Sequence, residues 1–182
     1  MLINIGKISK KSEVLGPGKR YIIWVQGCIF RCEGCYNTEY QPLKENQLMD
    51  TEDIIKDILE EKENIEGVTF LGGEPLLQAK QLAEIAYACQ KNNLSILCYT
   101  GFENKEILRL NNENINKLLK YTDVLIDGKY IKEQRIDTGY RGSSNQNIIF
   151  LSKRYKKEDF NKKNSYEIEI EKSKVIIKGF YK

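Results

Sequence analysis

Three cysteines lie close together in the segment 27–37, which reads GCIFRCEGCYN and places them at Cys28, Cys32 and Cys35. Because they share one short loop, their thiolates can converge on a single centre. Thiolates are soft ligands that select zinc, copper(I) or an iron–sulfur cluster. The sequence contains no histidine, so a Ser-His-Asp triad, a Cys-His nucleophile and any histidine-ligated zinc or haem site are excluded.

A closed structural zinc site needs a fourth ligand. The other two cysteines, Cys89 and Cys98, fall inside a predicted helix and an apolar strand, and we expect both to be buried thiols. Three cysteines without a fourth suit a 4Fe-4S cluster that keeps one iron open for a substrate or cofactor. A zinc site completed by a carboxylate or by a partner chain is the alternative that the spacing leaves open.

Strands and helices alternate along the chain at the interval typical of βαβ units. The sequence therefore predicts an α/β protein with a parallel sheet, either doubly wound or rolled toward a barrel. Apolar runs predict strands at 21–26, 67–71, 94–99, 123–127 and 147–151. Amphipathic patterns predict helices at 51–62, 76–91 and 103–120, the last broken near Asn111 and Asn112.

The last segment of the chain has a different pattern. Residues 166–171 (YEIEIE) and 174–180 (KVIIKGF) alternate between polar and apolar side chains around a Lys-Ser turn. Such alternation is typical of antiparallel strands, so we predict a C-terminal β-hairpin.

Polar or glycine-rich segments follow several of the predicted strands. They read GGEP at 72–75, YTG at 99–101 and DGK at 127–129, with RGSSNQ at 141–146 shortly after. Ligands of parallel α/β sheets and barrels bind beyond the carboxyl ends of the strands. These segments therefore predict a binding site at one rim of the sheet, together with the cysteine loop.

In order along the chain, GCxxxCxGCYN, GGEP, YTG, DVLIDGKY and YRGSSNQ resemble the signature of the radical S-adenosylmethionine (SAM) superfamily. Within it they are most similar to the activating proteins of anaerobic ribonucleoside-triphosphate reductase. The resemblance covers roughly residues 14–150. It implies a partial, open βα barrel of about five or six mainly parallel strands, by analogy with the family. We accordingly divide the chain into a radical SAM domain at 1–150 and a C-terminal extension at 151–182.

The resemblance also implies a cofactor site. Cys28, Cys32 and Cys35 would hold three irons of a 4Fe-4S cluster, and SAM would chelate the fourth. Gly72 and Gly73 would let the backbone approach the cofactor closely. Further candidate cofactor contacts are Tyr36, Asn37, Glu74, Thr100, Asp127, Lys129, Arg141, Asn145 and Gln146. For Thr100 a plain turn is the competing interpretation.

Three of these candidates carry specific expectations. Glu74 would pair with the SAM ammonium, or instead cap the helix that begins near Pro75. Asp127 and Lys129 would point from a strand end into the cleft, with a simple Asp-Gly-Lys turn as the competing interpretation.

The implied activity is reductive cleavage of SAM at the cluster, followed by hydrogen abstraction from one glycine in the large subunit of the anaerobic reductase. No catalytic side chain is expected beyond the cluster and SAM. An electron donor such as flavodoxin or ferredoxin would supply the electron. Two alternatives stay open: a radical SAM enzyme that modifies another protein, peptide or small molecule, with the hairpin as its recognition element, and a non-catalytic thiolate–metal module that binds a partner.

Charge and hydropathy limit the remaining partners. The net charge is +3, and the charges are interleaved without the basic stripe that nucleic-acid binding needs. The longest apolar runs, about five residues, are too short to span a bilayer. The N-terminal residues lack the features of a signal peptide. We therefore expect a cytoplasmic protein with no nucleic-acid or membrane partner, in which free cysteines stay reduced.

Overall fold

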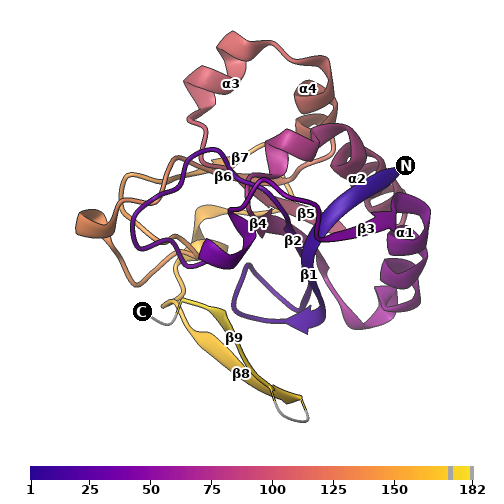
Figure 1. Cartoon of the computed structure of the whole chain (residues 1–182), viewed down its shortest axis with the longest axis horizontal. Helices are drawn as coiled ribbons and strands as arrows, with labels where there is room; N and C mark the ends of the chain where they lie inside the picture. The colour runs from indigo at the N-terminus through magenta and orange to yellow at the C-terminus, as the bar shows by residue number, and fades with distance from the viewer. Residues whose placement is uncertain (172–173, 181–182) are drawn as a thin grey trace.

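The computed structural model describes residues 1–171 and 174–180. Within these residues the central element is a seven-stranded sheet in the order β3-β1-β2-β4-β5-β6-β7 (Figure 1). Its strands are β1 (Leu2–Ser12), β2 (Arg20–Val25), β3 (Gln47–Asp50), β4 (Gly67–Gly72), β5 (Ser95–Tyr99), β6 (Val124–Asp127) and β7 (Asn147–Phe150).

The parallel part of the sheet was predictable. Strands β2, β4, β5 and β6 are parallel neighbours. Together with β7, which is antiparallel to β6, they match the five predicted strands within one residue at each end. All six residues of β2 are buried, as the continuous apolar run of a central parallel strand requires.

The sheet is larger and less uniformly parallel than predicted. Strand β1 pairs antiparallel with both β2 and β3, and neither β1 nor β3 was predicted. Within the described residues β3 and β7 are the two ends of the strand order, so the partial barrel remains a prediction.

One predicted helix begins differently from the prediction, and another is broken where the sequence predicted a break. The predicted helix at 76–91 begins with a 3-10 turn, η3 (Pro75–Gln78). The predicted helix at 103–120 is broken, as expected, at Asn111, whose φ of 41° is left-handed. The helices are α1 (Thr51–Glu60), α2 (Ala79–Lys91), α3 (Asn104–Leu110) and α4 (Glu113–Lys120), with 3-10 turns η1 (Thr38–Tyr40), η2 (Lys62–Asn64), η3, η4 (Lys132–Gln134) and η5 (Lys157–Phe160).

The two faces of the sheet have different surroundings. Ile23 and Val25 of β2 belong to the large core cluster, to which α1, α2, α3 and α4 all contribute. Ile22 and Trp24, which point to the opposite face, cluster with Leu71 and with loop residues instead. A doubly wound sheet carries helices on both faces. In the described chain the α-helices cover one face, so the doubly wound arrangement is excluded.

The C-terminal residues lie against the face that the α-helices leave uncovered. Tyr155 and Phe160 are buried with Leu97, Val124 and other residues of β5 and β6. The predicted hairpin is present as β8 (Tyr166–Glu171) and β9 (Lys174–Gly179), and it projects at the lower edge of the view in Figure 1. The Lys-Ser turn predicted between its strands lies outside the described residues. The division into domains at residue 150 remains a prediction.

None of the helices in the described part of the chain has the length and apolar character that crossing a bilayer requires.

Candidate metal and cofactor site

The three cysteines of the 27–37 loop line a single cavity of about 550 Å³. The cavity lies at the carboxyl ends of the parallel strands, as predicted. Cys28 follows β2, Gly73 follows β4, Thr100 follows β5 and Lys129 follows β6, and all four line it.

The cysteine loop is held in place by backbone hydrogen bonds to η1 and the residue after it. Gly27 N donates to Tyr40 O at 2.8 Å, and Cys28 N donates to Gln41 O at 2.9 Å. Gly27 has a φ of +98°, a conformation that favours glycine. The sharp turn after β2 directs the loop over the end of the sheet.

The thiols have the chemistry that a thiolate-bound cluster needs. Cys28 is buried, whereas Cys32 and Cys35 are half-buried. Burial raises the pKa of both the Cys28 and Cys32 thiols, so metal binding there must release protons. Within the described residues, no group of three or more Cys, Asp or Glu side chains is close enough together to hold one metal ion. The donor set of three thiols on one cavity wall nevertheless fits a cluster with three cysteine ligands.

Cys89 and Cys98 are buried thiols, as predicted. They are 1% and 0% exposed, and neither is among the residues that line the cavity. Burial raises the pKa of the Cys89 thiol to about 12, which leaves it protonated and a poor metal ligand at neutral pH.

Gly72 and Gly73 touch the cysteine loop and β2 at very close range. A Cβ on Gly73 would lie 2.2 Å from Gly27 O, and one on Gly72 would lie 2.7 Å from the Cα of Trp24. Gly73 N also donates to Val25 O at 2.8 Å. The two glycines are therefore required by the close approach of the protein backbone itself, a reason that the sequence interpretation did not include. Their role toward the cofactor stays a prediction.

Glu74 connects three parts of the site. Its carboxylate accepts hydrogen bonds from Leu76 N (2.9 Å), Thr100 Oγ1 (2.8 Å) and Gly101 N (2.8 Å). The bond from Leu76 N is the predicted cap of the helical segment, and the other two join the segment to the turn after β5. Burial raises the pKa of Glu74 to about 7, while the three hydrogen bonds favour its ionised form. Glu74 also lines the cavity, so its role toward SAM stays a prediction.

Replacing Glu74 with glutamine tests this connection. An amide has one acceptor oxygen, so at least one of the three buried donors would face an NH₂ group and lose its partner. We expect E74Q to lower the free energy of unfolding by about 1–3 kcal/mol, measured by urea denaturation. Leu76→Ala, which leaves all three donors in place, separates loss of the hydrogen bonds from loss of packing nearby. An unchanged unfolding midpoint in E74Q would show that the carboxylate is not what joins these segments.

Five other predicted residues line the cavity and three do not. Those in the lining are Tyr36, Asn37, Thr100, Lys129 and Gln146. The Lys129 ammonium lies 4.9 Å from the centre of the Phe30 ring. The predicted residues that do not line the cavity in the described structure are Asp127, Arg141 and Asn145.

Asp127 was expected to point into the cleft, but its carboxylate instead bonds Asn104 and Asn147. Oδ2 accepts from Asn104 N at 2.7 Å, and Oδ1 accepts from Asn147 N at 3.1 Å and Nδ2 at 2.8 Å. It therefore joins the start of α3 to β7. A carboxylate at a strand end can serve a ligand or a neighbouring backbone, and the sequence pattern is the same for both.

The RGSSNQ segment is held by hydrogen bonds within the segment and to neighbouring loops. Arg141 Nη1 donates to Gln146 O at 2.7 Å, and Asn145 Nδ2 donates to Lys129 O at 2.8 Å. Gln146 lines the cavity and uses its amide to bond Gly128 O and the N–H groups of Gly142 and Ser143. The buried Arg141 Nε and Asn145 Oδ1 have no hydrogen-bond partner in the described structure.

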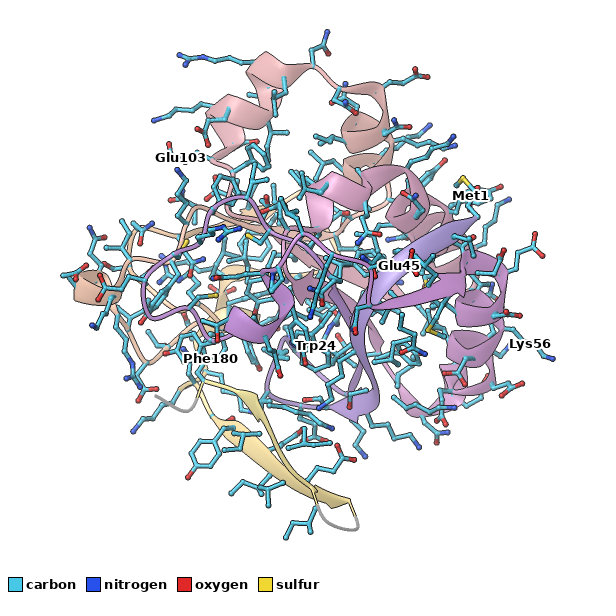
Figure 2. The ribbon with its side chains drawn as sticks, viewed as in Figure 1. Met1, Trp24, Glu45, Lys56, Glu103 and Phe180 are labelled. Atoms are coloured by element: carbon cyan, nitrogen blue, oxygen red, sulfur yellow. The ribbon has the colours of Figure 1, made fainter. Side chains whose placement is uncertain are left out.

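One wall of the cavity comes from a part of the chain that the sequence did not connect to the site. The residues Val175–Phe180 line it. The Phe180 ring packs edge-on against Tyr36, with centroids 5.6 Å apart, and Tyr130 packs on Tyr36 at 5.4 Å. Figure 2 shows Phe180 at the base of the hairpin. Alternating residues predicted the hairpin, but no local pattern indicates what a hairpin packs against.

Comparison with known proteins indicates the same family as the sequence motifs. Residues 14–149 match the family described as the 4Fe-4S single cluster domain. The anaerobic ribonucleoside-triphosphate reductase-activating protein of Enterobacteria phage T4 is 32% identical over 152 residues, which cover 80% of this chain and 93% of that protein. The protein of the same name from Vibrio cholerae is 34% identical over 145 residues, covering 74% and 90%.

A second group of activating enzymes is also similar, over a smaller share of its length. The pyruvate formate-lyase-activating enzyme of Clostridium pasteurianum is 32% identical over 145 residues, which cover 75% of this chain but 55% of that enzyme. Both groups are activating enzymes, and the family match includes the three cysteines and the GGEP segment. The chain therefore belongs to the 4Fe-4S single cluster family of radical SAM activating enzymes, whose cofactors are a 4Fe-4S cluster and S-adenosylmethionine.

Proposed function

We propose that this chain is an activase that generates a glycyl radical on the large subunit of an anaerobic ribonucleoside-triphosphate reductase. The observation that carries the proposal is the extent of the similarity to reductase-activating proteins. It covers 93% and 90% of the two relatives from phage T4 and Vibrio cholerae. The similarity to a pyruvate formate-lyase-activating enzyme covers 55% of that enzyme, so nearly half of its length has no counterpart in the match.

When bound, a reduced 4Fe-4S cluster and SAM would supply the chemistry: one-electron reductive cleavage of SAM to methionine, coupled to removal of a hydrogen atom from the glycine Cα, with 5′-deoxyadenosine as the other product. This chain's residues bind and orient the cofactors. Cys28, Cys32 and Cys35 hold the cluster. Thr100 and the Gly72–Glu74 segment also line the cavity, and they position SAM.

The remaining walls keep water from the reacting atoms. Trp24, Leu71, Tyr36 and Phe180 give the cavity a largely apolar lining. A radical is protected when solvent and competing hydrogen donors are excluded from the site. Asn37 and Lys129, also in the lining, supply polar groups for the carboxylate or ribose of SAM. Three predicted residues outside the lining hold the loops that carry the lining residues in place: Asp127, Arg141 and Asn145.

The proposal extends to partners and location. The electron donor is a flavodoxin or a ferredoxin, and the reaction takes place in the cytoplasm, where reductants of this kind operate. A nucleic-acid or membrane partner is not part of the proposal.

Anaerobic reconstitution with iron and sulfide, followed by dithionite and SAM, tests the function. We expect a glycyl doublet in the electron paramagnetic resonance spectrum when the host's anaerobic reductase is added, and none with pyruvate formate-lyase. A preparation that cleaves SAM but gives no doublet on the reductase would contradict the proposal and favour another protein, peptide or small-molecule substrate. A preparation that holds zinc and cleaves no SAM would favour a non-catalytic module.

A further inference from the structure

The C-terminal hairpin has a polar face and an apolar face, and they are oriented opposite to the usual arrangement. A strand that packs on a protein normally turns its apolar side chains inward. In β8 and β9 the register pairs Glu167 with Lys178 on one face and Ile168 with Ile177 on the other. The polar face lies against the body of the protein, and the apolar face is exposed.

Hydrogen bonds fix the polar face to the N-terminal part of the chain. Lys178 is 5% exposed; its Nζ donates to Ser9 Oγ at 2.6 Å and lies 2.7 Å from Glu169 Oε2. Glu167 Oε1 accepts from Glu13 N at 2.8 Å. An isolated two-stranded hairpin is marginally stable, so these contacts determine how the hairpin is oriented.

The outward face is a continuous apolar strip. Its side chains occupy alternate positions of both strands, and each is between 42% and 75% exposed. Direct cross-strand pairs, Ile168 with Ile177 and Ile170 with Val175, join the two halves of the strip. We call this strip the hairpin face; it consists of Tyr166, Ile168, Ile170, Val175 and Ile177.

The hairpin face adjoins the cofactor cavity along strand β9. Strand β9 belongs to both, because Val175 and Ile177 of the hairpin face also line the cavity. A polypeptide whose glycine enters the cavity must leave it past the cavity walls, and β9 is one of them. Such a chain would meet the hairpin face as soon as it emerges.

A second copy of this chain fits the hairpin face less well. A stable dimer uses about 20–30 residues on each side, and the strip offers five. A transient complex with an enzyme substrate requires less buried area. The family match ends at residue 149, so the hairpin lies outside the part of the chain that the match covers. An element beside the cavity and outside the matched region is suited to selecting a particular substrate protein.

We propose that the hairpin face is a docking surface for the protein substrate, and that it binds an apolar segment of the glycyl-radical enzyme next to its glycine loop. The inference rests on the proposed function. The described side chains of this face carry no charge, so the matching segment of the substrate is apolar. Burial of that segment holds the reductase while its glycine occupies the cavity.

A matched pair of double variants tests the docking surface. I168T/I170T and I168V/I170V both keep β-branched side chains, which suit a strand, and they differ in a hydroxyl against a methyl at each position. Neither Ile168 nor Ile170 lines the cavity. The measurement is the initial rate of glycyl-radical formation as a function of reductase concentration, alongside SAM cleavage without the reductase.

We expect I168T/I170T to raise the KM for the reductase about tenfold or more, with kcat and uncoupled SAM cleavage unchanged. I168V/I170V should stay close to the wild type. Since β9 forms part of the cavity wall, normal SAM cleavage also reports that the hairpin has kept its place. If the double threonine variant loses SAM cleavage, I170T replaces it, because Ile170 is the most exposed residue of the face.

Three results would overturn the inference in distinguishable ways. An unchanged KM in the threonine variants, with normal radical formation by the wild type, would reject the docking surface alone. A wild-type protein that cleaves SAM without forming any radical on the reductase would reject the proposed function and the docking surface with it. A wild-type dimer in sedimentation that becomes a monomer in I168T/I170T would assign the hairpin face to a second copy.

Discussion

Replacing Cys32 with alanine is expected to prevent assembly of the 4Fe-4S cluster and to abolish SAM cleavage. The three loop cysteines are the only ones among the described residues that line the cavity. Because Cys89 and Cys98 are buried at other positions, neither thiol can substitute for a missing ligand. Iron content after anaerobic reconstitution, together with 5′-deoxyadenosine production, measures the loss directly. We expect about four irons per wild-type chain.

Cys89→Ala is the matched control for this prediction. It removes a thiol of the same chemistry from α2, so we expect full iron content and SAM cleavage. The cost should be confined to stability, about 1–2 kcal/mol for the small cavity left in the core, read from urea denaturation. If C32A retained its iron or its activity, or if C89A lost them, the assignment of the ligands would be wrong.

The parallel strands and the cysteine loop were predictable because the signals for both are local. The run Tyr21–Val25 is apolar and β-branched because β2 is buried on both faces. The cysteine spacing is a property of one loop, and three thiols at that spacing already indicate a metal or cluster site. The positions of GGEP, YTG and DGK at strand ends then follow from a rule of parallel sheets.

Strands β1 and β3 were missed because their burial depends on the rest of the molecule. The sequence of β1 contains Gly6 and several lysines, which weaken the local strand signal. Only some of its residues are buried, and β3 is an exposed or half-buried edge strand. Their pairing with β2 and with each other determines that they are strands, and no short window of sequence contains that information.

The functions of individual polar residues were the least predictable part of the site. Asp127 ends one predicted strand and Thr100 follows another. Asp127 accepts hydrogen bonds from Asn104 and Asn147, whereas Thr100 lines the cavity and bonds Glu74. The contacts of the hairpin could not be predicted from its sequence either. Its alternation predicted two strands, but the buried position of Lys178 depends on Ser9, which is far away in the sequence.

Replacing Gly73 with alanine is expected to destabilise the protein and to impair cluster assembly. The new Cβ would lie 2.2 Å from Gly27 O and 2.9 Å from Tyr40 O. Both are backbone atoms, and both hold the cysteine loop, since Gly27 N bonds Tyr40 O and Glu74 N bonds Gly27 O. The loops cannot separate without losing those hydrogen bonds. We expect a loss of about 3 kcal/mol in the free energy of unfolding and a clear drop in iron bound after reconstitution.

Gly101→Ala separates this steric argument from a general intolerance of side chains in the site. Its Cβ would also be too close, 2.4 Å from the Phe30 ring, but that ring is half-buried and can turn toward solvent. We therefore expect a milder loss, about 1 kcal/mol, with iron binding retained. If G73A were no more damaging than G101A, the backbone contact between the GGEP segment and the cysteine loop would not be what fixes the cluster site. A larger effect at Gly73 in both stability and iron content would show that the two loops are positioned by each other before any cofactor binds.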